Sequence, residues 1–290
     1  MRVGYLGPEG TFSEEAGKIY QKKIVSDIKL VPFNTIHDLL LAADKKRIDS
    51  AIVPIENSID GTIGIVTDML AKEVNLKISQ EIILPVYHYL LAQKGIRMDE
   101  ITDIISHPQP IEQCKNFLRK NLPKAKLHLA YSTSEAARQV ALSLGEKVIS
   151  HGKIKGNIFA AIGNIAASKL YGLTIVARKI NAKDNQTRFV VLTKKDSKES
   201  GKDKTSIVFS LPKDTPGGLH DVLLEFACRN INLTKIESRP SKKALGDYYF
   251  FLDFQGHHND KEIKRALSMV KSKVAFYKML GSYPCANIKN

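Results

Sequence analysis

Polar side chains gather where apolar strands of the sequence give way to loops or helices. The first such corner is GPEGTFS at residues 7–13, where two glycines allow close backbone approach and Thr11 and Ser13 offer hydroxyls. The second is VPIENSIDGT at residues 53–62, directly behind an apolar strand. Its side chains could hold a polar ligand through several hydrogen bonds; they are Glu56, Asn57, Ser58, Asp60 and Thr62.

Three later corners carry further candidates. The segment SHPQ holds His107, which could act as an acid, a base or a hydrogen-bond donor. The segment STS begins at Ser132 between a strand and a helix. The segment DNQTRF places Thr187 beside Arg188 and Phe189, and an arginine can clamp a carboxylate through two parallel hydrogen bonds.

Each corner also has a purely structural explanation. The patterns Thr11-x-x-Glu14 and Ser132-x-x-Glu135 resemble capping boxes, and such a helix cap is worth about 1 kcal/mol. Asparagine, serine and aspartate are common turn formers, and a lone histidine is more often structural than catalytic. A functional interpretation stays open beside the structural one, because α/β domains bind ligands at the ends of their strands.

Several classes of protein lack support in the sequence. There is no HExxH, GxSxG or Walker pattern and no Cys/His cluster, so nothing indicates a metal site or a serine hydrolase. The cysteines Cys114, Cys228 and Cys285 lie far apart, as is typical of a reducing cytoplasm. No apolar run reaches the roughly 18 residues of a membrane span, and the first residues read as a strand rather than a secretion signal. We therefore expect a cytoplasmic protein with no metal and no membrane partner.

The charge of the chain indicates an anionic partner. Lys+Arg 44 against Asp+Glu 30 gives a formal net charge of +14, which attracts anions over long distances. Charge alone does not separate a nucleic acid from a small acid. The chain has no tryptophan, no aromatic-rich sheet motif and no helix-turn-helix pattern, so we expect no nucleic-acid partner.

The length of 290 residues suits two compact domains. In residues 1–193, strands expected at 2–6, 51–55, 103–107, 126–131 and 174–180 alternate with helices expected at 13–20, 36–46, 111–119, 134–144 and 159–170. This alternation predicts an α/β domain with largely parallel sheets. Residues 77–93 are too long for one typical strand, so we expect them to cross between two lobes with a cleft between.

Residues 194–204 are rich in charge, serine and glycine, and we expect them to form a solvated linker. Residues 205–290 then read as strand, helix, two strands, helix and strand, a ferredoxin-like βαββαβ arrangement. Two segments of this domain could contact a small ligand, namely Gly217–His220 and Glu237–Pro240.

Together these motifs resemble those of the prephenate dehydratase family. GPEGTFS, VPIENSIDGTI, SHPQPIEQC, YSTSEAA and NQTRF occur in the order and approximate spacing of that family, and GGLHDVL and ESRP resemble its regulatory ACT domain. The resemblance covers residues 3–284. It implies a two-lobed catalytic domain like a type 2 periplasmic binding protein, with the site in the cleft, followed by an ACT domain. It also implies a cytoplasmic homo-oligomer joined through its ACT domains. Since the chain starts at its first strand, we expect it to be monofunctional.

The resemblance also implies a reaction and its residues. Prephenate would lose carbon dioxide and hydroxide to give phenylpyruvate, with no cofactor because aromatisation drives the step. Thr187 would be the catalytic residue, hydrogen-bonding the leaving hydroxyl, with Glu56 as an alternative proton donor. The implied substrate contacts are Thr11, Ser13, Asn57, Ser58, Thr62, His107, Ser132, Arg188 and Phe189. The implied contacts to L-phenylalanine as inhibitor are Gly218, Leu219, His220, Asn232, Glu237 and Ser238.

Two alternatives stay open at this stage. Arogenate, which has an amino group where prephenate has a keto group, could be the substrate. A non-catalytic protein that binds a small anion would share the cleft. Asn181 also stands where many members of the family have aspartate.

Overall fold

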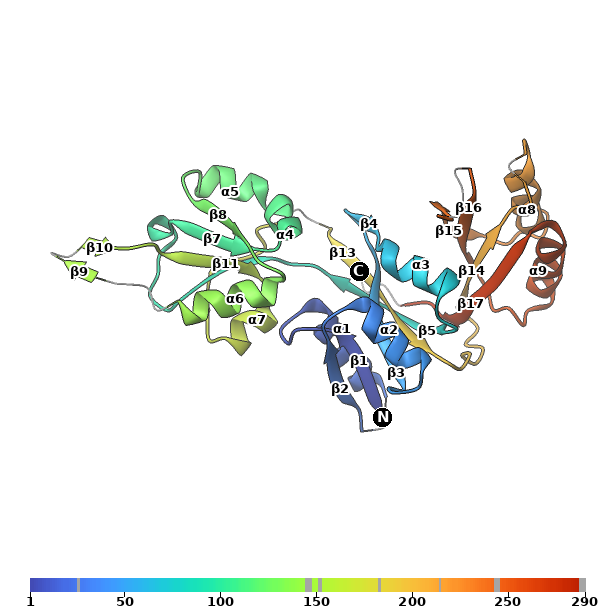
Figure 1. Cartoon of the computed structure of the whole chain (residues 1–290), viewed down its shortest axis with the longest axis horizontal. Helices are drawn as coiled ribbons and strands as arrows, with labels where there is room; N and C mark the ends of the chain where they lie inside the picture. The colour runs from blue at the N-terminus through green and yellow to red at the C-terminus, as the bar shows by residue number, and fades with distance from the viewer. Residues whose placement is uncertain are drawn as a thin grey trace.

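The computed structural model describes residues 1–24, 27–143, 148–150, 153–181, 184–213, 215–242 and 246–286. Sheets of six, five and four strands form the framework of the molecule. Figure 1 shows them in a row, with the six-stranded sheet in the middle. The expected ends of a helix at residue 144 and of the second domain at residues 287–290 lie outside the described residues.

The central lobe is built on the six-stranded sheet. Its strands are β1 (Arg2–Leu6), β2 (Lys29–Phe33), β3 (Ser50–Asn57), β4 (Gly61–Thr62), β5 (Lys77–Pro85) and β13 (Gln186–Thr193). The order is β2-β1-β3-β13-β5, with β4 paired to β3. Strand β1 is parallel to β2 and β3, whereas β13 is antiparallel to β3 and β5. The helices of this lobe are α1 (Phe12–Lys23), α2 (Ile36–Asp44) and α3 (Gly64–Lys72).

The distal lobe is built on the five-stranded sheet. Its strands are β6 (Tyr89–Ala92), β7 (Asp103–Ser106), β8 (Lys126–Leu129), β11 (Phe159–Gly163) and β12 (Thr174–Ala177), in the order β12-β6-β11-β7-β8. Its helices are η1 (Met98–Glu100), α4 (Pro108–Gln113), α5 (Lys115–Asn121), α6 (Thr133–Leu142) and α7 (Ile165–Leu170). A separate two-stranded sheet pairs β9 (Val148–Ser150) with β10 (Lys153–Lys155).

Side-chain caps fix where several helices begin. Thr11, Thr35 and Ser132 each accept a hydrogen bond from the backbone N–H three residues later, at the starts of α1, α2 and α6. Each cap satisfies one of the backbone donors that the first turn of a helix leaves without a partner. The capping patterns that the sequence shows at Thr11 and Ser132 therefore place the starts of α1 and α6 correctly.

The chain crosses between the two lobes twice, from β5 to β6 and from β12 to β13 (Figure 1). Asn181 ties the two crossings together, because its Oδ1 accepts from the backbone N–H of His88 at 2.8 Å and its Nδ2 donates to the carbonyl of Val86 at 2.8 Å. The expected crossing of residues 77–93 is confirmed, since this stretch contributes β5 to one lobe and β6 to the other.

The third sheet belongs to the C-terminal domain. Strands β14 (Asp203–Ser210), β15 (Leu233–Pro240), β16 (Tyr248–Gln255) and β17 (Phe276–Pro284) are antiparallel in the order β15-β16-β14-β17. Helices α8 (Gly218–Ala227) and α9 (Lys261–Lys273) share a hydrophobic core with one face of this sheet. The sequence prediction of a βαββαβ domain is therefore confirmed.

The other face of this sheet packs against the central lobe. Val208, Tyr249, Phe251, Leu280 and Tyr283 join one hydrophobic cluster with buried residues of α2, α3, β3 and β5. Strands β17 and β5 approach each other closely. A Cβ atom on Gly281 would lie 2.3 Å from the carbonyl oxygen of Ile78 and 2.9 Å from its nitrogen. The close approach of the two domains therefore requires glycine at this position.

Several predicted elements differ from the structure. Residues 159–163, expected in a helix, form β11 in the interior of a sheet, and α7 starts only after Asn164 caps it. The helix expected at residues 111–119 is divided at Cys114 into α4 and α5. Both large sheets mix parallel and antiparallel pairs rather than being largely parallel. The first of these errors arises because a short apolar run has the same appearance in a buried strand and in a buried helix.

The expected linker is shorter than predicted. Strand β13 ends at Thr193 and β14 begins at Asp203, so Asp203 and Lys204 belong to the C-terminal sheet. Lys194 forms an ion pair with Asp44, which holds the start of the linker on the central lobe. No helix in the described part of the chain is both long and apolar enough to span a membrane.

Gly281→Ala is expected to destabilise the protein by about 3 kcal/mol, because the added carbon meets the backbone of β5. Gly246 is a matched control. The φ angles of Gly281 (+138°) and Gly246 (+94°) are both unfavourable for alanine, but nothing lies within 4 Å of a carbon added at Gly246. Gly246→Ala should cost only about 1 kcal/mol. Urea unfolding followed by circular dichroism measures both, and equal costs would contradict the close-approach explanation.

Candidate functional site

A cleft of about 210 Å³ lies between the central and distal lobes. Residues of both lobes and of the first crossing line it: Phe12, Asn57, Val86, His88, His107, Gln109, Pro110, Gln113, Tyr131, Ser132, Thr133 and Thr187. The set is rich in hydrogen-bonding groups and includes aromatic rings, and it contains no lysine or arginine. Among the residues that the structure describes, only neutral donors are therefore placed to hold an anion in this cleft.

Thr187 and Asn57 are register partners on β13 and β3. The Asn57 Oδ1 atom accepts from the backbone N–H groups of Ile59 and Asp60 at 2.9 and 3.1 Å, which fixes the orientation of the amide. Its Nδ2 therefore donates to Thr187 Oγ1 at 2.9 Å and to Asn185 Oδ1 at 2.9 Å. The Thr187 oxygen acts as the acceptor, so its hydroxyl hydrogen is left to donate to a molecule in the cleft.

Side-chain amides bridge the two lobes across this cleft. Gln113 on α4 donates to Asp60 Oδ2 at 2.7 Å, and its Oε1 accepts from Asn185 at 2.9 Å. Gln109, one turn earlier on α4, also donates to Asp60. Since Asp60 follows β3 and α4 belongs to the distal lobe, these bonds hold the lobes in the arrangement that shapes the cleft.

His88 lies buried at the first crossing, where its ring meets Phe12 edge to face at 5.8 Å between centroids. Its Nε2 contacts Gln113 Oε1 at 3.1 Å, and because that oxygen is an acceptor, Nε2 carries the proton. Burial lowers the pKa of His88 to about 4, although the hydrogen bond to Gln113 and the charge of Asp60 oppose the shift. Burial also lowers the pKa of His107. Both rings are neutral at pH 7.

Four of the expected site residues line the cleft, namely Asn57, His107, Ser132 and Thr187. His107 and Ser132 also cap helices, since Nδ1 of His107 accepts from the backbone of Gln109 at the start of α4 and Ser132 starts α6. His107 and Ser132 therefore both cap a helix and line the cleft, so the structural explanation of these corners does not exclude the functional one.

Four other expected substrate contacts have different surroundings. Thr11 caps α1, and Ser13 is buried within the same helix. Ser58 accepts from the backbone N–H of Gln186 at 2.9 Å and contacts the carbonyl of Asp184, outside the cleft lining. Phe189 is 2% exposed and packs in the hydrophobic core of the central lobe, so the expectation that it touches substrate is wrong. As strand side chains alternate between faces, Phe189 shares a sheet face with Thr187 but lies deeper in the lobe.

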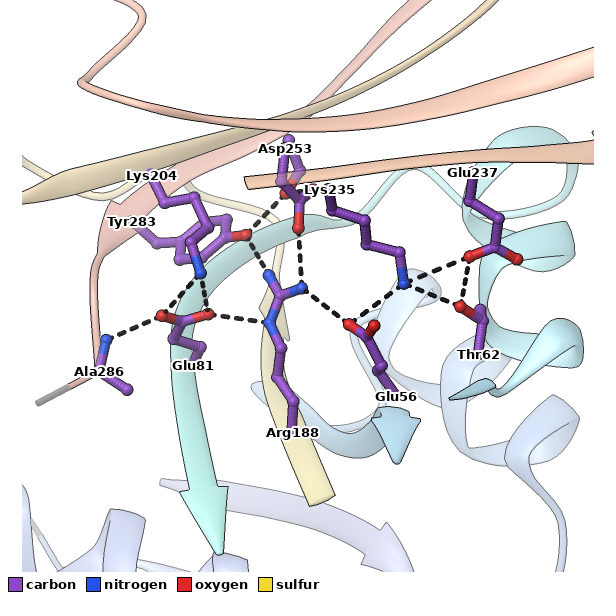
Figure 2. A network of polar contacts seen from close by, with 11 residues as sticks. Glu56, Thr62, Glu81, Arg188, Lys204, Lys235, Glu237, Asp253, Tyr283 and Ala286 are labelled. Carbon is purple, nitrogen blue, oxygen red and sulfur yellow. Dashed lines mark hydrogen bonds and ion pairs between the residues drawn. The ribbon is translucent and has the colours of Figure 1, made fainter. Parts of the chain in front are cut away.

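Arg188 also departs from the expectation, because it points away from the cleft and towards the C-terminal domain (Figure 2). Its Nε donates to Glu81 at 2.8 Å, one terminal nitrogen donates to Asp253 at 2.7 Å, and the other donates to Tyr283 at 2.6 Å. Burial opposes its charge, yet Tyr283, Asp253 and Glu81 raise the pKa of Arg188 well above its usual range. All three guanidinium nitrogens are thus hydrogen-bonded, two of them to the C-terminal domain and none to a group in the cleft.

Glu56 and Thr62 lie on the same side of the central sheet as Arg188. Figure 2 shows both turned towards Lys235 of β15, with the Glu56 carboxylate 3.6 Å from Arg188 and 3.2 Å from Lys235. Thr62 donates to Glu237 of β15. Neither Glu56 nor Thr62 lines the cleft, because adjacent residues of a strand point to opposite faces of the sheet.

The expected effector contacts lie on α8 and β15. Gly218 lines a groove of about 470 Å³ that also involves Leu211, Asp221 and Lys273. Leu219 packs against the core of the domain, and His220 is exposed. Along β15 alternate residues face opposite ways, so Ser238 is exposed while Glu237 turns towards the central lobe. Asn232, just before β15, accepts a backbone bond from Gln255.

Sequence reasoning did not assign eight cleft residues, namely Phe12, Val86, His88, Gln109, Pro110, Gln113, Tyr131 and Thr133. Two of them had a visible signal, since Gln109 and Gln113 stand four residues apart behind His107 and so share one face of a helix. Among the residues that the structure describes, no three His, Cys, Asp or Glu side chains form a group that could hold a metal ion.

The fold and cleft define a two-lobed α/β protein with a further C-terminal domain, and an ACT domain model matches residues 205–268 of that domain. A family model described as prephenate dehydratase matches residues 3–197. The chain belongs to the prephenate dehydratase family.

Known relatives extend over nearly the whole chain. It is 38% identical to the bifunctional chorismate mutase/prephenate dehydratase of Aquifex aeolicus, covering 99% of this chain and 74% of that protein. It is also 38% identical to the prephenate dehydratase of Methanocaldococcus jannaschii, covering 97% of both. The crystal structure of prephenate dehydratase from Arthrobacter aurescens in complex with L-Phe is 30% identical, with a TM-score of 0.86, and the match covers 99% of this chain and 90% of that one.

His88→Gln is expected to reduce the loss of stability in acid. The unfolded chain binds a proton on His88 near pH 6.5 and the folded protein only near pH 4. Between these values the unfolded state holds the extra proton, so the free energy of unfolding falls as the pH falls. Wild type should lose about 3 kcal/mol more than His88→Gln across this interval. Unfolding in urea at a series of pH values measures the difference, and parallel curves would show that His88 is not responsible.

Proposed function

We propose that this protein catalyses the decarboxylative dehydration of prephenate to phenylpyruvate, as a carbon–oxygen lyase in the cytoplasm. The observation that carries the proposal is the Thr187 hydroxyl, which Asn57 holds as a hydrogen-bond donor in the interlobe cleft. Membership of the prephenate dehydratase family supports the choice of substrate.

In this reaction the protein has to position the substrate and to stabilise the charge that develops on the leaving oxygen. As the carboxylate leaves as carbon dioxide, the electron pair of the broken C–C bond enters the ring. The ring C–O bond breaks with its pair on the departing oxygen, and a proton completes water. The Thr187 hydroxyl stabilises the negative charge that develops on this oxygen, and a single such donor is typically worth about 10²–10³-fold in rate. Glu56 is not placed to supply the proton, because it lies on the opposite face of the sheet.

Neutral donors would hold the two carboxylates of the substrate. Ser132 and Thr133 stand at the start of α6 within the cleft lining, where free backbone N–H groups and the helix dipole favour an anion. The side-chain amides of Gln109 and Gln113 also line the cleft, and each has one N–H left beside the one that it donates to Asp60. The net charge of +14 would speed the arrival of a dianion, an effect that salt weakens.

We further propose that L-phenylalanine inhibits the enzyme by binding to the ACT domain in a homo-oligomer joined through these domains. The related Arthrobacter structure contains L-Phe, which supports this choice of effector. The binding would involve Gly218, Leu219, His220, Asn232 and Ser238, while Glu237 would act through the central lobe that it contacts. Because coupling is reciprocal, prephenate should weaken L-phenylalanine binding by the same factor.

Thr187→Ala is expected to lower kcat for phenylpyruvate formation by about 10²–10³-fold, because it removes the donor to the leaving oxygen. Thr187→Ser keeps the hydroxyl and should retain most of the turnover. Circular dichroism and the melting temperature of each variant establish that it is folded. Wild-type turnover by Thr187→Ala would sink the assignment, and folded wild type that converts arogenate but not prephenate would change the substrate.

Leu219→Ala is expected to raise the concentration of L-phenylalanine needed for half-inhibition by about tenfold, because it removes apolar contact area. Leu224→Ala is the control, since Leu224 lies on the same helix and is 46% exposed. The ratio of inhibited to uninhibited turnover is measured for both. If the two variants respond alike, Leu219 is not an effector contact.

A further inference from the structure

The β3–β4 hairpin presents its two faces to different parts of the molecule. Asn57 lines the cleft and holds Thr187, and Asp60 in the turn of the hairpin accepts hydrogen bonds from α4 of the distal lobe. Glu56 and Thr62 are register partners on the opposite face, which meets the ACT domain. Any force applied to Glu56 and Thr62 therefore acts on the same short element that positions the cleft.

Lys235 of the ACT strand β15 holds this second face of the hairpin (Figure 2). Its Nζ donates to Thr62 Oγ1 at 2.8 Å and lies 3.2 Å from Glu56 Oε2. It is also 3.3 Å from Glu237 Oε2, and the Glu237 carboxylate accepts from Thr62. The Lys235 side chain is only 14% exposed and the Glu237 side chain 22%, whereas Glu56 is 36% exposed, so the ammonium group is the most shielded member of this cluster.

We propose that Lys235 is a positioning residue for the catalytic cleft, acting from the regulatory domain through Glu56 and Thr62. It holds the hairpin at the angle that lets Asn57 orient the Thr187 hydroxyl. This inference rests on the proposed function for its catalytic meaning, but the mechanical link itself depends only on the contacts of Lys235.

The same strand offers a route for regulation. Lys235 and Glu237 face the central lobe, while Ile236 and Ser238 between and beyond them are exposed on the other face of β15. An effector that contacts Ser238 and shifts β15 therefore moves Lys235 with it. The hairpin then turns, and the Asn57–Thr187 pair loses its alignment. Lys235 thus carries inhibition from the effector surface to the cleft.

The test compares Lys235→Met with a matched control. Lys242→Met also removes an interdomain ion pair, that of Lys242 with Asp68 on α3 at 2.7 Å, but leaves the hairpin contacts in place. Lys235→Met should lower kcat for prephenate about tenfold with KM changed less than about twofold. It should also lose inhibition by L-phenylalanine while calorimetry still detects L-phenylalanine binding. Lys242→Met should match wild type in each measurement.

Hydrogen exchange of residues 56–62 provides a readout that needs no turnover. Exchange should be faster in Lys235→Met than in wild type or Lys242→Met. Lys235→Gln, which keeps a donor but not the charge, serves if Lys235→Met fails to fold. Equal exchange and equal kcat in the Lys235 and Lys242 variants would overturn the proposal. If wild type does not convert prephenate, the proposed function fails, yet the exchange comparison still decides the role of Lys235.

Discussion

The burial of one cation, the Arg188 guanidinium, constrains how the whole molecule is assembled. A buried charge is tolerable only when its donors are partnered, and removing a partner from such a site costs about 3–5 kcal/mol. The partners of Arg188 come from two domains, with Glu81 on β5 of the central lobe and Asp253 and Tyr283 on the ACT sheet. The central sheet and the ACT sheet must therefore dock in one register, and the contact between Gly281 and β5 allows them to come close enough.

Because β3 and β13 are pleated, Arg188 and the residues that line the cleft lie on opposite faces of the sheet. Thr187 and Asn57 form one register pair and Arg188 and Glu56 form the next, so the two pairs project from opposite faces of the sheet. One face thus serves the cleft and the other serves the ACT domain, within two residues of chain on each strand. The ACT domain attached at this place needs no long pathway to reach the cleft residues, because only the thickness of one sheet separates the two surfaces.

Local patterns in the sequence predicted the helix caps, the βαββαβ domain and the crossing between lobes, because each depends on nearby residues. They did not predict which way Arg188 points, since that is set by Asp253 and Tyr283, which are distant in sequence. Likewise, residues 159–163 form a strand because they pair with β6 and β7 on either side, and these partners are distant in sequence. In the cleft, Thr187 was found from its motif, whereas His88 was missed because an isolated histidine in an apolar crossing strand carries no local signal of its surroundings.

The order of strands in the central sheet sets an order of events during protein synthesis. Strand β13 lies between β3 and β5, yet it leaves the ribosome about a hundred residues after β5 ends at Pro85. The distal lobe, whose strands lie between β5 and β13 in the chain, can close its sheet first. At usual translation speeds of about 5–20 residues per second, the edges of β3 and β5 stay unpaired for roughly 5–20 seconds. The nascent chain therefore exposes one edge of β3 and the whole of β5 to chaperones until β13 is made.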